Sequence, residues 1–143
     1  MKLTIPGIPV AKARHRSTRF GTYNPQKEKE NSFKILLLSL VSKMPKDSLN
    51  LTKATSYCLD LTFHMPIEKS CSKSKRTAKL TNAIEHAQKP DVDNLCKFFL
   101  DCANGILYRD DCMITHIICK KYWSDNPRTE VVIIPKIKNQ EPI

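Results

Sequence analysis

The sequence predicts an α+β fold in which a mixed β-sheet of about four or five strands packs with two or three helices. Two observations lead to this prediction. Apolar residues recur at helical spacing between Asn24 and Pro45, and they alternate with other residues from Thr55 to Met65. Two further apolar segments follow near the C-terminus. The chain has 143 residues, no internal repeat and no long linker, so we expect residues 1–143 to form a single domain.

The first segment, Leu3 to Val10, is expected to be a strand at a sheet edge, because Pro6 and Pro9 interrupt it. The next segment, Ala11 to Tyr23, contains no Asp or Glu. Its basic and aromatic residues are Lys12, Arg14, His15, Arg16, Arg19, Phe20 and Tyr23. Such a segment is either a solvated, flexible loop or a surface that contacts phosphates, and we favour the second interpretation.

A helix is expected to begin at Asn24–Pro25, a cap followed by a proline, and to stop at Pro45. One stripe of this helix should face the core: Phe33, Leu36, Leu37, Leu40 and Met44. Ile35 and Leu38 lie on the other side, where a surface helix should be polar. Either a second element or a second subunit covers them, which makes this face an argument for a homodimer.

The segment Thr55 to Met65 should form a strand that Pro66 ends. From Glu68 to Gln88 the composition changes to Ser, Thr and Lys, which predicts a mobile loop with a short helix ending near His86. The basic residues of this loop are Lys69, Lys73, Lys75, Arg76 and Lys79. They form a candidate clamp on a phosphate backbone.

The central stretch runs from Lys89 to Asp111 and gathers acidic residues in a basic chain. Pro90 ends the preceding segment, and Asp91, Asp93 and Asn94 resemble the cap and first turn of a helix over 93–104. Gly105 suits the position just past the end of that helix. A short strand, Ile106 to Tyr108, should then lead to Asp110 and Asp111.

Element lengths indicate that these acids can meet. A helix over 93–104 rises about 16 Å, at about 1.5 Å per residue. A strand over 106–111 covers about 17 Å, so a reversal at Gly105 returns Asp111 to the start of the helix. Clustered carboxylates of this kind suit magnesium. The alternative is that Asp91 and Asp93 only cap the helix, and that Lys97 only forms an intrahelical ion pair with Asp93.

Met113 to Trp123 and Arg128 to Ile137 are expected to be strands covered on both faces, because apolar residues occupy both parities. Residues 138–143 should form a tail.

The six cysteines include no Cys-x-x-Cys pair; they are Cys58, Cys71, Cys96, Cys102, Cys112 and Cys119. We therefore expect buried or reduced thiols, and we do not expect Cys112, His116 and Cys119 to bind zinc.

The chain is strongly basic, with a formal net charge of +10 and a pI of about 9.4. A polyanion, most often nucleic acid, is the usual partner of such a protein. No segment approaches the roughly 20 apolar residues of a membrane span, and the N-terminus does not resemble a signal peptide. We expect a cytoplasmic protein without a membrane partner or a small-molecule cofactor.

The run from Lys89 to Lys97, followed by Asp101, Asn104-Gly105, Tyr108 and Asp110-Asp111, resembles the signature of RusA-type endodeoxyribonucleases. The start, Pro9 to Arg14, is also typical of RusA-like chains. These enzymes are Holliday junction resolvases of phages and prophages.

The resemblance implies a dimeric, RusA-like α+β nuclease that uses Mg²⁺, with Mn²⁺ as a substitute. It would resolve branched DNA by paired nicks in recombination and repair. Asp91, Asp93 and Asp111 would be the essential, metal-binding acids and Lys97 their charged partner. Whether Asp110 or Asp101 assists is open. The expected DNA contacts are Lys12, Arg14, Arg16, Arg19, Lys73, Lys75, Arg76 and Lys89. The competing interpretation is a non-catalytic or inactive DNA-binding module with a basic surface.

Overall fold

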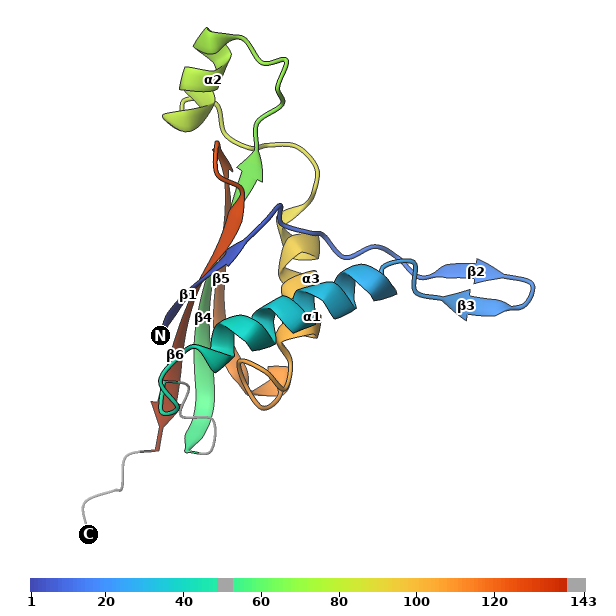
Figure 1. The fold of residues 1–143 in the computed structure, drawn as a ribbon, viewed down its shortest axis with the longest axis vertical. Coiled ribbons are helices and arrows are strands. Elements are labelled where there is room, and N and C mark those ends of the chain that lie inside the picture. The colour runs from blue at the N-terminus through green and yellow to red at the C-terminus, as the bar shows by residue number, and fades with distance from the viewer. Residues whose placement is uncertain (49–52, 139–143) are drawn as a thin grey trace.

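Four strands form the central sheet of this protein, whose computed structural model describes residues 1–48 and 53–138. The strands are β1 (Lys2–Pro6), β4 (Ala54–Pro66), β5 (Ile114–Ser124) and β6 (Arg128–Ile137), in the order β1-β6-β4-β5 (Figure 1). Strand β6 is antiparallel to β1 and to β4, whereas β4 and β5 run parallel. The sheet is therefore mixed, and β1 and β5 are its edges.

Two long helices lie on one face of this sheet. Helix α1 (Lys27–Ser42) contacts β1, and helix α3 (Val92–Ala103) contacts β5 and α1. A third helix, α2 (Lys73–Leu80), lies beyond the end of the sheet (Figure 1). The prediction of an α+β fold, with a mixed sheet of about four or five strands and two or three helices, is confirmed. The described residues form a mixed sheet of four strands, a small sheet of two strands and three α-helices.

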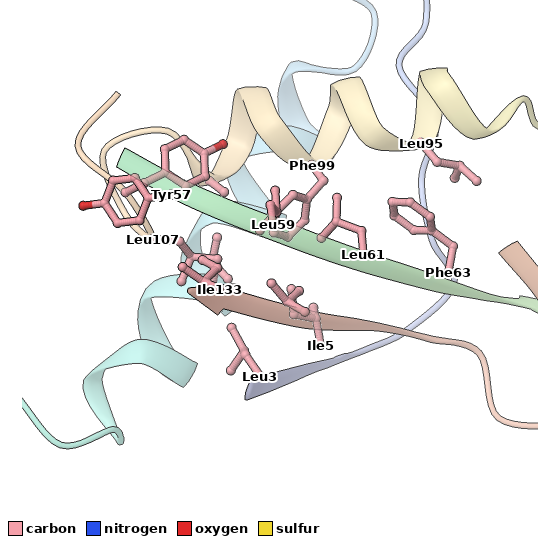
Figure 2. Packing of buried hydrophobic residues seen from close by; sticks show 14 of the residues in the cluster. Leu3, Ile5, Tyr57, Leu59, Leu61, Phe63, Leu95, Phe99, Leu107 and Ile133 are labelled. Carbon is pink, nitrogen blue, oxygen red and sulfur yellow. The ribbon is translucent and has the colours of Figure 1, made fainter. Parts of the chain in front are cut away.

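The core lies between the sheet and the two long helices, and Figure 2 shows its packing. The buried side chains of β4 alternate along the strand, as its sequence pattern predicts. They pack with residues from β1, β6, α1, α3 and the segment after α3, among them Leu3, Ile5, Leu37, Leu95, Phe99, Leu107 and Ile133. On α1 the predicted stripe faces this core, with Leu37 fully buried. Ile35 and Leu38 remain 68% and 53% exposed.

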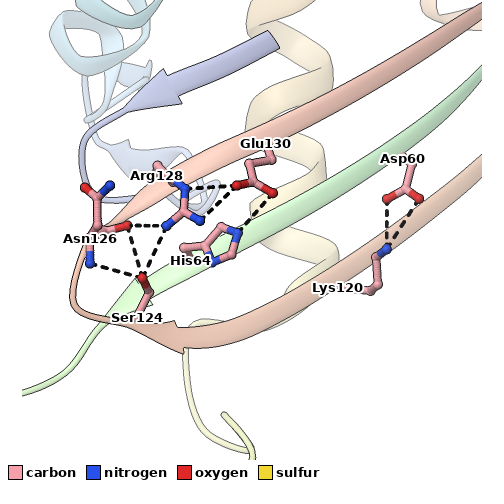
Figure 3. A network of polar contacts seen from close by, with 7 residues as sticks. All are labelled: Asp60, His64, Lys120, Ser124, Asn126, Arg128 and Glu130. Carbon is pink, nitrogen blue, oxygen red and sulfur yellow. Dashed lines mark hydrogen bonds and ion pairs between the residues drawn. The ribbon is translucent and has the colours of Figure 1, made fainter. Parts of the chain in front are cut away.

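The opposite face of the sheet carries no helix in the described part of the chain. Ile118 and Ile134 point to this side and are 57% and 55% exposed, so the prediction that both C-terminal strands are covered on two faces is wrong. Polar contacts cross the same face near its upper end (Figure 3). They include the ion pairs Lys120–Asp60 at 3.2 Å, His64–Glu130 at 3.3 Å and Arg128–Glu130 at 2.9 Å. Two of these pairs join β4 to its neighbours β5 and β6.

The N-terminal elements differ from the prediction in two places. The expected loop over Ala11 to Tyr23 contains a small hairpin, β2 (Arg16–Thr18) paired with β3 (Gly21–Tyr23). Helix α1 begins later than expected, because Asn24 accepts a hydrogen bond from the backbone N–H of Gln26 at 2.9 Å and forms a turn. Gln26 is then the N-cap residue.

The apolar run Ile106 to Tyr108 is a turn and not the predicted strand. The backbone N–H groups of Ile106 and Leu107 both donate to the carbonyl of Ala103, which folds the chain back under the end of α3. The Tyr108 hydroxyl donates to the carbonyl of Leu100 at 2.7 Å and fixes the turn there. A short 3-10 helix, η1 (Asp111–Met113), follows and leads into β5.

Most of the predicted tail, residues 139–143, lies outside the described residues. In the part of the chain that the structure describes, no helix is both long and apolar enough to cross a membrane.

Candidate functional site

The N-cap and the first turn of α3 present two carboxylates, those of Asp91 and Asp93. Asp91 is the N-cap residue, with extended backbone angles of φ −68° and ψ 142°, but its side chain makes no capping hydrogen bond. Asp93 accepts one from the backbone N–H of Asn94 at 2.9 Å. Both side chains are exposed. The alternative that Asp91 serves only as a cap is therefore not supported, because its oxygens remain free to bind another group.

The loop before α3 is held by strand β5. The Lys121 ammonium donates to the backbone carbonyls of Gln88 and Pro90, the latter at 2.9 Å. An open depression beside this loop is lined by Lys89, Pro90, Asp91 and Asn94. Lys121 thus fixes the backbone that carries Asp91. No sequence pattern predicts this contact, because Lys121 is distant in the chain and only the strand register brings it to the loop.

Lys97 lies one turn after Asp93 and is exposed. No ion pair joins these two side chains in the described structure, so the predicted alternative of an intrahelical pair does not hold. Asp101, one turn further on, is 3.0 Å from the ammonium of Lys12, which also contacts Glu30 at 2.8 Å. Burial opposes the charged form of Lys12, but the hydrogen bonds to Glu30 and Asp101 outweigh it and raise its pKa.

Asp110 and Asp111 lie at the opposite end of α3, directly after the turn under its C-terminus. Asp110 caps η1 by accepting a hydrogen bond from the backbone N–H of Cys112 at 3.0 Å, and this bond lowers its pKa. The Asp111 carboxyl forms a hydrogen bond with the Asp110 side chain, and the negative charge of Asp110 disfavours ionisation of Asp111. Both effects raise the pKa of Asp111. The two carboxylates therefore differ in how free they are to bind a ligand, because that of Asp110 already accepts a backbone hydrogen bond.

One chain does not bring Asp111 to Asp91 and Asp93, and the predicted meeting of these acids is wrong for a single subunit. Lys121 marks the level of Asp91 on β5, and β5 begins at Ile114, close to Asp111. Seven residues of strand cover about 23 Å, so Asp111 lies on the order of 20 Å from Asp91. Accordingly, no cluster of three His, Cys, Asp or Glu side chains within residues 1–48 and 53–138 could hold a metal ion. The length estimate failed because it treated the turn at 106–108 as an extended strand.

The basic residues predicted to bind DNA fall into two groups. The side chains of the first group are exposed and form no ion pair among the described residues: Arg14, Arg16, Arg19, Lys73, Lys75 and Lys89. Lys12 and Arg76 are instead engaged in ion pairs, Lys12 as described above and Arg76 with Asp125. The first group is free to contact phosphates, whereas the second has a structural partner already.

His86 packs against an aromatic ring and does not present its side chain on the surface as Asp91 does. Its ring lies 4.2 Å from the Trp123 ring, centroid to centroid, and is buried, although His86 lines one depression together with Lys89 and Pro90. Lys79 covers the other side of this cluster, 4.0 Å from the Trp123 ring centre, and pairs with Glu68 at 2.7 Å. This packing attaches α2 to the end of β5. All six thiols are free, as predicted.

Comparison of the sequence with known proteins identifies its family. The sequence model of a family described as Endodeoxyribonuclease RusA matches residues 6–134, which include both acidic pairs and Lys97. A relative from Bacillus subtilis (strain 168), named "Uncharacterized protein YqaN", is 30% identical over 136 residues, which are 93% of this chain and 94% of that protein. The chain therefore belongs to the RusA endodeoxyribonuclease family.

Proposed function

We propose that this protein is a magnesium-dependent endodeoxyribonuclease that cuts branched DNA, including Holliday junctions, by paired nicks. The observation that supports this most directly is the first turn of α3. There, the Asp91 carboxylate is exposed and makes no capping bond, although Asp91 is the N-cap residue. Asp93 lies in the same turn, and Lys97 lies one turn further along the helix. Membership of the RusA family supports the reaction type.

Asp91, Asp93 and Asp111 fit a divalent cation of this kind, because exposed carboxylate oxygens are the hard ligands that Mg²⁺ and Mn²⁺ prefer. A bound Mg²⁺ supplies the positive charge that activates a water and stabilises the leaving oxygen in phosphodiester hydrolysis. Lys97 places an ammonium beside the same carboxylates. It stabilises charge on the scissile phosphate or gives a proton to the leaving oxygen.

A site that uses all three acids has to be assembled from two chains. The two ligand groups lie on the order of 20 Å apart in one subunit, whereas ligand oxygens of one Mg²⁺ lie about 2.1 Å from it. A second copy placed antiparallel along α3 would bring its Asp111 to the Asp91 end of the first. By the two-fold symmetry, the reverse contact would form as well. The homodimer then carries two equivalent sites, as paired nicking requires.

Strand β5 offers the surface for such a dimer. It is an edge strand, and His116, Ile117 and Ile118 near its middle are all exposed. Antiparallel pairing of two β5 strands about His116 would pair Ile114 of one chain with Ile118 of the other. Asp111, three residues before the strand, would then lie toward the Lys121 end of the partner strand. Lys121 contacts the carbonyl next to Asp91. The exposed Ile35 and Leu38 lie on α1, toward the other edge of the sheet, and a dimer there would leave the acids apart.

The basic surfaces suit the DNA. The β2–β3 hairpin and α2 extend from two different parts of the body (Figure 1) and carry most of the exposed arginines and lysines named above. Phosphate contacts of this type fix the position of DNA and make its binding dependent on salt.

A cleavage assay on a labelled four-way junction, with and without Mg²⁺, tests the proposal. We expect nicks near the branch point with Mg²⁺ and none in chelator. Asp93→Asn should abolish cleavage, while junction binding survives or tightens, because one negative charge near the phosphates is lost. Asp47→Asn serves as the matched control, because it removes one exposed negative charge outside the proposed ligand set. A wild-type protein that binds the junction but cuts it in neither Mg²⁺ nor Mn²⁺ would instead be the non-catalytic module.

A further inference from the structure

The β2–β3 hairpin projects from the body of the protein as an arm (Figure 1). Every residue from Ala13 to Tyr23 is exposed, and the two strands pair only with each other. We call residues 13–23 the basic arm. Its hydrogen bonds above the root are local, so the rest of the fold does not need the arm for its core. Its exposed side chains are therefore available for a partner.

A phenylalanine occupies the tip of this arm. Phe20, in the turn between β2 and β3, is 87% exposed. The Thr18 hydroxyl donates to the Gly21 carbonyl at 3.2 Å and accepts from the Phe20 N–H at 3.2 Å, which holds the turn. The Arg19 guanidinium lies over one face of the Phe20 ring, 4.8 Å from its centre. The tip thus presents a flat apolar ring with a positive charge beside it.

The charged residues of the basic arm indicate which class of partner the Phe20 ring binds. The arm carries Arg14, His15, Arg16 and Arg19 and no carboxylate. Phosphates attract these charges, and every nucleobase has a flat face on which an aromatic ring can stack. Bases inside a continuous duplex are already stacked on both sides. At a branch point, base stacking is interrupted, so a ring can stack without first separating two base pairs.

The root of the arm is joined to the helix that carries Asp93. The buried side chain of Gln26 bridges both strands of the root, donating to the Ala11 carbonyl at 2.8 Å and accepting from the Ala13 N–H at 2.7 Å. The Lys12 backbone N–H donates to the carbonyl of Asn94 in the first turn of α3, at 2.8 Å. The root of the arm is therefore fixed relative to the proposed reaction site.

We propose that Phe20 stacks on an exposed base at the branch point of junction DNA and thereby determines the preference for branched over linear DNA. This inference rests on the proposed function, since it assigns a selectivity role within the same DNA complex. Arg16 and Arg19 contact the flanking phosphates, and the rigid root holds the branch point at a set position relative to Asp93.

The test measures binding by the full-length protein, without divalent cation, to a four-way junction and to a linear duplex of the same arm sequence. Phe20→Ala should lower junction affinity by about 5- to 150-fold, the effect expected from the loss of one base–aromatic stack, and duplex affinity by less than about 2-fold. Phe20→Trp should retain the wild-type preference. Ile35→Ala, which removes an exposed apolar side chain outside the arm, is the matched control and should change neither affinity.

A second measurement uses the added indole of Phe20→Trp. Its emission, taken as the difference from wild-type protein, should be quenched by the junction and not by the duplex. Equal losses on both DNAs in Phe20→Ala, no loss on either, or an unquenched indole would overturn the role of Phe20 while leaving the proposed function intact. A wild-type protein that binds junction and duplex equally would also overturn this role, whereas the proposed function is decided by the cleavage assay alone.

Discussion

The proposed two-chain site makes a prediction that a one-chain site does not. Asp93→Asn and Asp111→Asn each remove one acid of the set, and each variant alone should lose at least about 100-fold in nicking rate, as expected for groups that fix a catalytic metal. In the two-chain arrangement, the mixed dimer has one site that lacks both acids and one site that is complete. Mixing the two inactive proteins should therefore restore activity.

The size of the recovery follows from the symmetry. Random exchange of subunits makes about half of the dimers mixed, and each mixed dimer has one complete site of two, so roughly a quarter of the wild-type sites return. The assay should score single nicks, because one intact site cuts only one strand of the junction. Subunit exchange is checked by co-purification of an untagged chain with a tagged one.

The matched control mixes Asp93→Asn with Asp91→Asn. These acids lie at the same end of α3, so every site in the mixed dimer remains damaged in either arrangement, and the mixture should stay inactive. If the Asp93→Asn and Asp111→Asn mixture were as inactive as this control despite verified exchange, the acids would not be shared between chains. The reasoning from the length of α3 and β5 would then be refuted.

Three further predictions concern single residues. Asp111→Asn should reduce cleavage clearly more than Asp110→Asn, because Asp110 is engaged with the backbone of η1; a reversed order in kinetic assays would move the ligand to Asp110. Replacing Arg14 and Arg16 with alanine should flatten the log–log salt dependence of junction affinity by up to about 1.8 units if both touch phosphates, and an unchanged slope would place them on a solvated surface. Burial and the nearby lysines lower the pKa of His86 in the folded state. At acidic pH the unfolded state therefore binds a proton at His86 that the folded state does not bind. Stability should therefore fall as the pH drops below about 6.5, and calorimetry should show a smaller fall in His86→Gln.

The sequence predicted the elements whose ends carry strong local signals. Strand β6 was predicted with both of its observed ends, after Pro127 and up to Ile137, and α3 within one residue at each end. Pro90 and Gly105 flank α3, and each acts through its own backbone geometry, which does not depend on the rest of the fold.

The failures came from short segments whose structure is decided by tertiary packing. The run Ile106 to Tyr108 has the composition of a strand, but its side chains pack under α3, and three apolar residues cannot distinguish a strand from a buried turn. This error displaced Asp111 by the length of a helix. The hairpin of the basic arm was missed for a different reason: both of its faces are polar, so no alternation marks it.

Because the acids lie at the two ends of α3, dimerisation and Mg²⁺ binding should depend on each other. Within one chain, Asp91 and Asp111 lie on the order of 20 Å apart, beyond the screening length of about 8 Å in physiological salt, so they repel little. Dimerisation would bring them together, and their repulsion would oppose association until a divalent cation lies between them. Mg²⁺ should therefore strengthen the dimer, and by linkage the dimer should bind Mg²⁺ more tightly than the monomer. Sedimentation at several chain concentrations should show a dimer that becomes more stable with Mg²⁺ in wild-type protein and does not in Asp93→Asn. An equal Mg²⁺ effect in both proteins would show that the ion acts elsewhere.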